Sequence, residues 1–141
     1  MKFKLVTLGG ELVNADVYEV IIPTIDGEIS VFPDHEPLIT VAKSGVVAVR
    51  YEKSHGDDYL EYFAISGGVI EINGKTVKIL VDEADQGQDI VEAETKAALD
   101  RAIEMRDNAQ DRVELDKAHQ LIDRHMVRLK VADLHRRKRK I

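Results

Sequence analysis

The pattern of apolar and polar positions divides the chain near residue 87. All three prolines and all nine glycines lie at or before Gly87. In this part, turn signals separate short apolar stretches about every eight to twelve residues, which is typical of an all-β sandwich or barrel. Seven of these stretches predict strands, at Lys2–Leu8, Asp16–Ile22, Ile39–Lys43, Val46–Tyr51, Tyr59–Ile65, Val69–Ile72 and Thr76–Val81.

Local features refine this β region. Both faces of the predicted strand Tyr59–Ile65 are largely apolar, so we expect it to be covered on two sides. Asn73 and Gly74 separate two apolar runs and tolerate the positive φ of a two-residue turn, so they predict a hairpin. The polar run Glu52–Asp58 predicts a longer loop, whose His55 and two aspartates fit a solvated loop better than a metal site.

After Gly87 the apolar positions follow the period of a helix. They recur at spacings of three and four residues from residue 91 to residue 109, and a second segment repeats every seven residues. These segments predict two helices of about 18–22 residues in an antiparallel hairpin, with His125 at a packed boundary position rather than a pH-sensitive one. The connection contains neither glycine nor proline, so one unbroken helix over residues 90 to about 135 fits equally well. If the two helices form a hairpin, we expect the hinge between them to comprise Asp107, Asn108 and Asp111.

Charge divides the chain at nearly the same place. Residues 1–85 carry 7 basic and 15 acidic side chains, a net charge of −8, whereas residues 86–141 carry 13 and 11, a net charge of +2. The last 18 residues hold eight basic side chains and one acidic one. We therefore expect two domains, an acidic β-sandwich over residues 1–85 and a helical hairpin with a basic end over residues 86–141.

The sequence offers few groups for catalysis or for binding a cofactor. It contains no cysteine, which excludes disulfides and thiolate chemistry, and no P-loop, dinucleotide-binding, zinc-protease or serine-hydrolase motif. The glycines at 9–10 and 67–68 fit turns or bulges better than phosphate-binding loops. The chain lacks a run long enough to cross a membrane and a recognisable signal or transit peptide, so we expect it to begin at Met1. We expect no catalytic residue, no metal and no cofactor.

The basic end is the strongest electrostatic feature. Taken alone, it fits a nucleic-acid ligand, an acidic protein partner or a solvated terminus. Nucleic acid is the least favoured of the three, because a single basic run on an acidic chain is a weak signal. This feature by itself supports a stand-alone adaptor that presents a basic helical hairpin to nucleic acid or to an acidic protein.

Three segments in fixed order carry a resemblance to a known family. They are GEISVFPDHEPLIT (27–40), SGGVIEINGKTVKILVDEA (66–84) and GQDIVEAETKAALDRA (87–102). Together they closely resemble the epsilon subunit of F-type ATP synthases, whose members carry a G-x-x-G-x-L/Y-P-G-H-A-P-L-L-T loop, a Gly-rich strand pair and a G-Q-D/E opening of a helical hairpin. The loop here departs from the family at Ser30 and Asp34, where glycines are usual, and at Glu36, where alanine is usual, so we expect it to be more polar.

The resemblance implies a fold, a role and a set of partners. The implied fold is an antiparallel β-sandwich of about ten strands followed by an antiparallel α-helical hairpin. The implied role is a non-catalytic central-stalk subunit that couples rotation of a proton-carrying membrane ring to ATP synthesis. Its expected partners are the gamma subunit, the ring and, with the hairpin extended, the catalytic beta and alpha subunits. Neither nucleic acid nor a homo-oligomer is expected. The expected location is the cytoplasmic face of the bacterial inner membrane, ahead of the plastid thylakoid.

The resemblance also assigns residues. In the family the hairpin either folds down on the sandwich or extends toward the catalytic subunits and inhibits ATP hydrolysis. Some members bind ATP through an I/L-D-x-x-R-A motif, but here Val91 and Glu94 replace its Asp and Arg, so we expect weak or absent nucleotide binding. The loop residues expected to contact the ring and gamma are Gly27, Glu28, Ser30, Phe32, Pro33 and His35. The residues expected to form a regulatory basic arm are Arg124, Arg128, Lys130, Arg136, Arg137, Lys138, Arg139 and Lys140.

Overall fold

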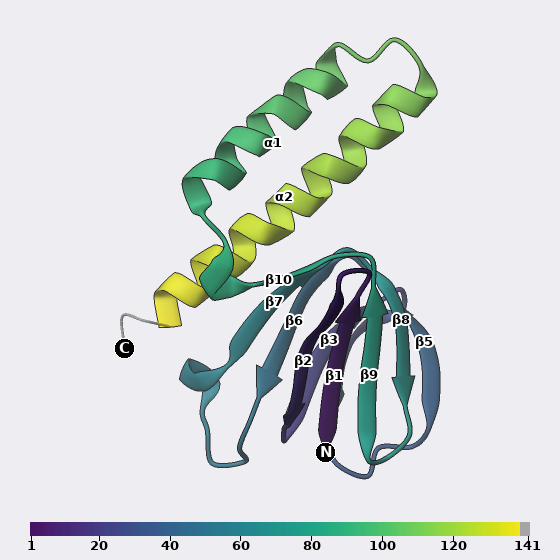
Figure 1. The fold of residues 1–141 in the computed structure, drawn as a ribbon, viewed down its shortest axis with the longest axis vertical. Coiled ribbons are helices and arrows are strands. Elements are labelled where there is room, and N and C mark those ends of the chain that lie inside the picture. The colour runs from purple at the N-terminus through teal and green to yellow at the C-terminus, as the bar shows by residue number, and fades with distance from the viewer. Residues whose placement is uncertain (139–141) are drawn as a thin grey trace.

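The computed structural model describes residues 1–138 and consists of a β-sandwich followed by two helices (Figure 1). The strands are β1 (Lys2–Thr7), β2 (Gly10–Asp16), β3 (Glu19–Thr24), β4 (Gly27–Val31), β5 (Leu38–Ala42), β6 (Gly45–Arg50), β7 (Glu61–Ile65), β8 (Gly68–Ile72), β9 (Thr76–Val81) and β10 (Ala84–Gln86). Two short 3₁₀ turns, η1 (Asp57–Tyr59) and η2 (Gly87–Asp89), precede strand β7 and the helices α1 (Glu92–Asp107) and α2 (Arg112–Lys138).

The ten strands follow one another across a sheet that folds on itself. Their order is β10-β7-β6-β3-β5-β8-β9-β1-β2, and β4 pairs with β3 off this path. In the described residues the pairs are antiparallel except for β1 and β9, which run parallel from the Lys2–Thr76 pair to the Val6–Leu80 pair. The expected fold, a sandwich of about ten strands with a helical hairpin, is confirmed, with one parallel pair inside the otherwise antiparallel sandwich.

The core lies between the two layers and follows the alternation of each strand. Phe3 and Leu5 of β1, Phe63 of β7 and Ile79 of β9 are fully buried there, together with twelve other buried residues. Strand β7 is covered on two sides, as its sequence predicts, because Phe63 faces this core while Ala64 packs against helix α2. Such burial of aliphatic and aromatic side chains is the main source of the stability of a sandwich.

Three strands escape prediction from the apolar pattern. Strands β2 and β4 each turn only two side chains toward the core, Val13 and Ala15 in β2 and Ile29 and Val31 in β4, so the alternation in each is short. Strand β10 has only three residues, all half-buried. The strand predicted at Asp16–Ile22 is wrong in its bounds, because residue 16 ends β2 and β3 begins at Glu19.

The β8–β9 hairpin forms, but its turn residues differ from the predicted pair. The register pairs Ile72 with Val77, and the Asn73 N–H donates to the Thr76 carbonyl at 3.1 Å, so the two central residues are Gly74 and Lys75. Only the first of these has a positive φ, of 88°, as in two-residue turns with glycine at the first central position. The predicted turn at Asn73-Gly74 is therefore wrong by one residue.

The helical part forms the predicted hairpin and not the unbroken helix. Helix α1 ends at Asp107, and Asp111 caps α2 by accepting a hydrogen bond from Glu114 N at 2.8 Å. The Glu114 carboxylate in turn accepts one from Gln110 N at 3.0 Å, which holds the connection against the first turn of α2. The helices have 16 and 27 residues instead of the predicted 18–22, because α2 continues beyond the hairpin to pack on the sandwich.

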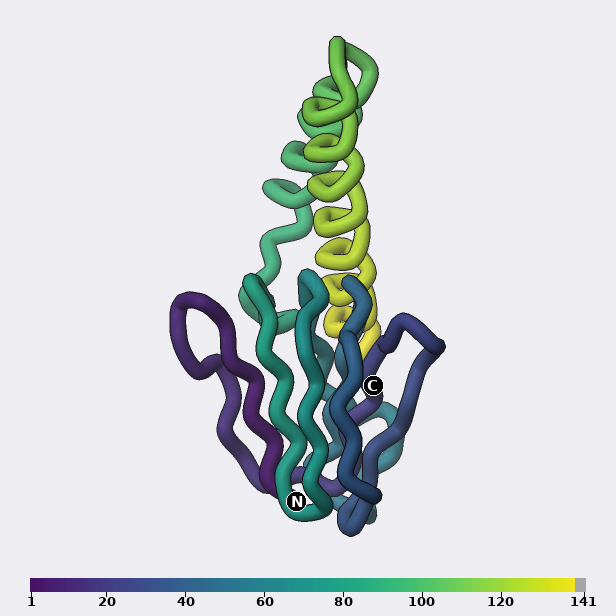
Figure 2. Tube along the Cα trace, turned by 90° about the vertical axis from the view of Figure 1, so that its right-hand side faces the viewer, coloured from purple at the N-terminus to yellow at the C-terminus, as the bar shows by residue number. Residues whose placement is uncertain are grey.

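Helix α2 attaches the hairpin to the sandwich. Its C-terminal half lies against β7, β6 and η2, while the tip of the hairpin points away from the sandwich (Figure 1). Figure 2 shows the same arrangement from the side. Among residues 1–138, no helix combines the length and the apolar character needed to cross a membrane.

Candidate functional site

Different connections between the strands lie at the two ends of the sandwich. At the helical end, the β1–β2, β5–β6, β7–β8 and β9–β10 connections lie beneath the hairpin (Figure 1). At the opposite end, called the far end, lie the N-terminus, the β4–β5 loop, the β6–β7 loop and the β8–β9 turn. The predicted contact loop and the predicted basic arm therefore occupy different parts of the molecule.

The β4–β5 loop is held against the far end by backbone hydrogen bonds and an aromatic contact. Asp34 N donates to the Gly74 carbonyl at 3.0 Å, which ties the loop to the β8–β9 turn. The ring of Phe32 meets that of Tyr18 edge to face, with centroids 5.5 Å apart. His35 N donates to the Phe32 carbonyl at 3.2 Å and closes the loop. The loop thus presents a fixed surface.

The structure spreads the six predicted loop residues along one edge. Gly27, with a φ of 117°, turns the chain from β3 into β4 near the helical end. Glu28 and Ser30 are exposed along β4, which is paired with β3 in the described residues. At the far end, Phe32 and Pro33 are exposed and His35 is half-buried. The set therefore forms a strip that ends in the loop rather than one compact patch.

The β6–β7 loop at the far end is ordered by ion pairs. Arg50 donates to Glu19 at 2.9 Å and to Asp57 at 2.7 Å, and these two carboxylates raise the pKa of the guanidinium. His55 stacks on the ring of Tyr59 at 4.6 Å. Asp57 is thus engaged in an ion pair with Arg50. Residues 1–138 contain no group of three or more side chains arranged to hold a metal ion. The sequence alone gives no sign of this role of Arg50, because Glu19 lies 31 residues away along the chain.

At the helical end, a small apolar cluster docks α2 on the sandwich. Ala64 of β7, Ile90, Val131 and Ala132 are buried together, with Val46, Tyr62 and Val127 packed around them. Helix α2 also comes unusually close to η2. A Cβ atom added to Gly87 would lie 3.0 Å from His135 Cβ and 3.3 Å from Val131 Cγ1. Glycine at this position therefore allows the docked arrangement.

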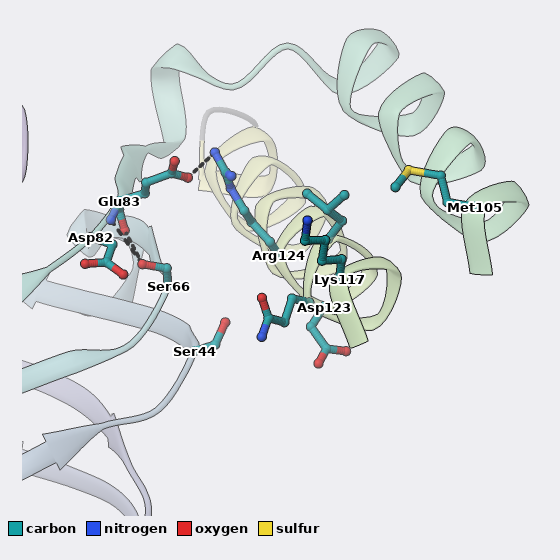
Figure 3. Close-up of a pocket in the computed structure, with 10 residues that line it drawn as sticks. Ser44, Ser66, Asp82, Glu83, Met105, Lys117, Asp123 and Arg124 are labelled. Carbon is teal, nitrogen blue, oxygen red and sulfur yellow. Dashed lines mark hydrogen bonds and ion pairs between the residues drawn. The ribbon is translucent and has the colours of Figure 1, made fainter. Parts of the chain in front are cut away.

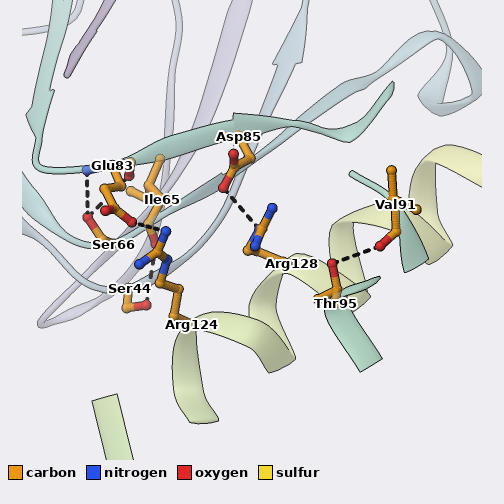
Figure 4. A network of polar contacts seen from close by, with 9 residues as sticks. All are labelled: Ser44, Ile65, Ser66, Glu83, Asp85, Val91, Thr95, Arg124 and Arg128. Carbon is orange, nitrogen blue, oxygen red and sulfur yellow. Dashed lines mark hydrogen bonds and ion pairs between the residues drawn. The ribbon is translucent and has the colours of Figure 1, made fainter. Parts of the chain in front are cut away.

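Two ion pairs flank this cluster and are called the latch. Arg124 pairs with Glu83, and Arg128 Nε lies 3.1 Å from Asp85 Oδ2 (Figure 4). The backbone of Glu83 is fixed to the β7–β8 turn, because Ser66 Oγ accepts from its N–H at 3.0 Å and donates to its carbonyl at 3.1 Å. The sandwich thus presents two carboxylates, one of them on a fixed backbone, to two arginines of α2.

Other members of the predicted basic arm also pair within the chain. Arg136 reaches both carboxylate oxygens of Glu92 on α1, each at 3.0 Å, and also pairs with Asp133. Arg137 Nε lies 3.1 Å from an Asp133 oxygen. Lys130 is exposed and Lys138 is half-buried. Two further predicted members, Arg139 and Lys140, lie outside the described residues.

A cleft separates the rest of the hairpin from the helical end. It has a volume of about 640 Å³ and lies between both helices and three connections of the sandwich (Figure 3). Arg124 reaches from α2 across its edge to Glu83. The cleft shows that the hairpin is attached mainly through the C-terminal half of α2. Its lining residues include Ser44, Ser66, Asp82, Met105, Lys117 and Leu121.

His125 lies on α2 among positive charges. Its side chain is half-buried, as a boundary position requires. Burial lowers the pKa of the imidazole, and the charges of Arg128, Arg124 and Arg101 lower it further. The neutral imidazole is therefore the favoured form at neutral pH.

Comparison with known proteins decides the family. Residues 1–87 match the family described as ATP synthase, Delta/Epsilon chain, beta-sandwich domain. ATP synthase epsilon chains from Staphylococcus aureus, among them those of strains JH9 and Newman, are 32% identical over 135 residues, which cover 95% of this chain and 97% of theirs. The chain belongs to the ATP synthase epsilon chain family. The resemblance found in its three motifs is confirmed.

Solved structures share the fold of this epsilon chain. A chain in the cryo-EM structure of the Euglena gracilis mitochondrial ATP synthase, OSCP/F1/c-ring, superposes with a TM-score of 0.74 at 22% identity, covering 92% of this chain and 79% of that one. A chain in the Tetrahymena thermophila mitochondrial ATP synthase central stalk and c-ring gives a TM-score of 0.60 at 16% identity, covering 94% and 96%. At these identities the match supports the fold.

The departures of this epsilon chain from the family motifs have local structural consequences. Asp34 adopts a left-handed conformation with a φ of 68°, which explains why the family usually has glycine there, and aspartate is among the few other residues that tolerate it. At the start of α1, Val91 is exposed and Glu94 presents a carboxylate, where the nucleotide motif has Asp and Arg. Weak or absent ATP binding stays a prediction.

Proposed function

We propose that this epsilon chain is a non-catalytic rotor subunit of a proton-translocating F-type ATP synthase. It couples rotation of the membrane ring to ATP synthesis, and its helical hairpin inhibits ATP hydrolysis when extended. The observation that carries the proposal is the way the hairpin is attached: one small apolar cluster and two ion pairs join a switchable element to a rigid sandwich.

The sandwich suits the transmission of torque. Its sixteen-residue core joins both layers, and such close-packed interiors deform little under load. The β4–β5 loop is tied to the β8–β9 turn by the hydrogen bond from Asp34 N to the Gly74 carbonyl. On this basis we assign contact with the ring and with gamma to Gly27, Glu28, Ser30, Phe32, Pro33 and His35. The exposed Phe32 supplies an apolar anchor, and Glu28 can pair with basic residues of a partner.

The hairpin suits a two-state switch. In the docked state, Arg124 and Arg128 are held by Glu83 and Asp85 of the sandwich. When the hairpin extends, both guanidinium groups are released and can pair with acidic segments of the catalytic beta and alpha subunits. The same charges therefore stabilise both states, so a modest difference in contacts shifts the equilibrium between them. The cap at Asp111 keeps the two helices distinct, and Asp107, Asn108 and Asp111 form the hinge.

The solved relatives support the proposed partners. Their names include F1, the c-ring and the central stalk of ATP synthases. We therefore take gamma and the ring as permanent partners, and the catalytic subunits as partners of the extended hairpin. We place the chain at the cytoplasmic face of the bacterial inner membrane, attached through the complex. We also propose the division into a rotor domain, residues 1–85, and a regulatory domain, residues 86–141.

A reversible disulfide tests the inhibitory role. The chain has no native cysteine, so the pair Gly87→Cys and His135→Cys can be introduced alone. A Cβ atom at position 87 would lie 3.0 Å from His135 Cβ, close to the roughly 3.5–4.5 Å of a disulfide, so a small shift suffices. Oxidation then locks the hairpin on the sandwich. In the assembled enzyme we expect faster ATP hydrolysis after oxidation than after reduction, with ATP synthesis retained.

The control is His135→Cys alone, whose enzyme should respond to neither treatment. Equal hydrolysis by the oxidised and reduced double variants would refute the inhibitory role. Failure of the wild-type chain to co-purify with gamma and the ring would refute the rotor role.

The alternative, a stand-alone adaptor with a basic hairpin, has less support. Arg124, Arg128, Arg136 and Arg137 pair with carboxylates of the same chain, which leaves fewer basic groups for an outside ligand. Filter binding to DNA or RNA, with an affinity that falls steeply with salt, would favour the adaptor.

A further inference from the structure

The chain contains three asparagines, and their surroundings differ. Asn14 lies in β2, Asn73 begins the β8–β9 turn, and Asn108 follows the last residue of α1. All three are exposed to solvent. An asparagine loses its side-chain amide when the backbone nitrogen of the next residue attacks its Cγ atom. The residue that follows each asparagine therefore decides which of the three reacts.

Asn73 is the one asparagine that glycine follows. The other two are each followed by alanine, whose Cβ atom crowds the attacking nitrogen. After Asn108, the N–H of Ala109 is also engaged, because it donates to the Arg106 carbonyl at 3.3 Å. Within residues 1–138, the N–H of Gly74 donates to no other group. The nitrogen beside Asn73 is therefore the least hindered of the three.

The turn also polarises the side-chain amide of Asn73. Its Oδ1 atom accepts hydrogen bonds from Thr76 N at 2.8 Å and from Lys75 N at 3.3 Å. Donors in this position stabilise the negative charge that develops on a carbonyl oxygen under attack. Because Gly74 lacks a Cβ atom and rotates freely about its backbone bonds, its nitrogen can approach Cγ at little steric cost. The turn thus combines an unhindered nucleophile with a polarised amide.

We propose that Asn73 is a site of spontaneous deamidation, whose isoaspartyl product releases the β4–β5 loop from the β8–β9 turn. The nitrogen of Gly74 forms a bond to Cγ of Asn73, and the side-chain NH₂ leaves as ammonia with the proton from that nitrogen. Water then opens the resulting cyclic succinimide. Breaking the new bond to Cγ gives aspartate. Breaking the original bond to the main-chain carbonyl carbon gives isoaspartate, in which the main chain runs through the former side chain and is longer by one methylene group.

The two products differ in their effect on the turn. In the unmodified chain, Asn73 N donates to the Thr76 carbonyl at 3.1 Å, and the Gly74 carbonyl accepts from Asp34 N of the β4–β5 loop at 3.0 Å. A methylene group inserted between residues 73 and 74 displaces the Gly74 carbonyl, because a two-residue turn has no slack for a longer main chain. The bond to Asp34 is then lost. Aspartate leaves the main chain unchanged and keeps an acceptor oxygen for Thr76 N, so the loop stays in place.

This chemistry does not depend on the proposed rotor function. Under that function, the released loop is the surface assigned to contact with the ring and with gamma. Isoaspartate at position 73 then lowers the affinity of an aged subunit for both partners.

Incubation of the purified full-length chain at mildly alkaline pH tests the site. Peptide mass spectrometry follows the replacement of NH₂ by OH at each asparagine, and the fragments distinguish isoaspartate from aspartate. We expect Asn73 to convert at least about tenfold faster than Asn14 or Asn108, with isoaspartate among the products. The control Asn73→Gln has a longer side chain that closes a larger ring, and it should stay unmodified. Equal rates at the three asparagines, or aspartate as the sole product, would overturn the inference.

Amide hydrogen exchange of the separated products tests the release of the loop. The isoaspartyl chain should exchange the Asp34 amide at least about tenfold faster than the fresh chain, while the core strands stay unchanged. The variant Asn73→Asp, which reproduces the other product, should exchange this amide like the fresh chain. Unchanged exchange at Asp34 in the isoaspartyl chain would overturn the release. Absence of gamma binding by the fresh chain would refute the rotor function and leave both of these results standing.

Discussion

Arg128 Nε lies 3.1 Å from Asp85 Oδ2, so helix α2 is joined by an ion pair to the last strand of the sandwich. Arg124 and Glu83 make the second pair one helical turn earlier. Both pairs are partly solvated, and pairs of this kind each contribute up to about 1 kcal/mol. They are therefore strong enough to bias a two-state equilibrium and weak enough to be exchanged for carboxylates of another subunit.

Reversing a latch charge should shift the hairpin toward the extended state. In Asp85→Lys, a lysine faces Arg128, and we expect the docked state to lose about 1 kcal/mol, or about fivefold in population. The assembled enzyme should then hydrolyse ATP more slowly. The double variant Asp85→Lys/Arg128→Glu restores the docked ion pair, so its hydrolysis should rise at least to the wild-type rate. It should rise further if Arg128 also binds the catalytic subunits in the extended state, because Arg128→Glu reverses that charge. Asp26→Lys, at an exposed position on the β3–β4 turn, is the control for the charge change. Equal rates for Asp85→Lys and the wild type would show that the latch does not bias the hairpin.

The close approach of α2 to Gly87 gives a steric test of docking. In Gly87→Ala the new methyl group would stand 3.0 Å from His135 Cβ, so the helix must move away from η2. We expect the docked state to lose about 1–3 kcal/mol, as in other overpacked contacts. Amide hydrogen exchange should report faster exchange around Ile90 than in the wild type, with the core strands unchanged. Gly56→Ala is the matched control, because nothing lies within 4 Å of its added methyl group. Unchanged exchange in Gly87→Ala would contradict the docked geometry.

The sequence predicts the strands and helices that have one or two largely buried faces. It misses the strands that bury few side chains. The two-sided apolar pattern of Tyr59–Ile65 anticipated a strand between the core and another layer, which proved to be helix α2. The edge strands β2 and β4 each place only two side chains against the core, so their alternation is too short to stand out in the sequence. The start of α2 at the Asp111 cap could be predicted from the sequence, since the D-x-x-E spacing from Asp111 to Glu114 marks a helix start.

The candidate site was less predictable than the fold. The arginines of the latch were singled out as basic residues, but their partners lie some forty positions away and are set by how α2 docks. The alignment of Val41, Val69 and Leu80 on one outer face likewise depends on the register of three strands. No local pattern in the sequence contains either relationship.

The left-handed backbone at Asp34 predicts an ordering of variants. A non-glycine residue in this region costs about 1–2 kcal/mol, which glycine avoids and aspartate partly offsets by local hydrogen bonding. We therefore expect Asp34→Gly to be at least as stable as the wild type and Asp34→Ala to be less stable by about 1 kcal/mol. Urea unfolding of the purified chain measures both. Greater stability of the alanine variant than of the glycine variant would show that the loop does not require this conformation.

The nucleotide motif predicts the response of the isolated chain to ATP. Val91 offers no polar group, and Glu94 would repel phosphates, so isothermal titration should detect no binding in the micromolar range. A matched titration of Val91→Asp/Glu94→Arg, which restores the Asp and the Arg of the family motif, tests whether these two positions decide the outcome. Micromolar affinity in the wild type would show that other residues of the chain supply the site.

The sequence favours a boundary role for His125 over a pH-sensitive one, but its surroundings in the structure predict a pH dependence of stability. Burial and the charges of Arg128, Arg124 and Arg101 lower its pKa in the folded chain below the usual 6.5. The unfolded chain therefore binds the proton more readily, so this group disfavours folding as pH falls through 6.5 toward the folded pKa. His125→Gln keeps a polar side chain that does not titrate, and it should lose less stability than the wild type between about pH 7.5 and about pH 5.5. Thermal unfolding of both chains at the two pH values measures the difference. An equal loss in the two chains would mean that His125 does not contribute to the acid sensitivity of the hairpin.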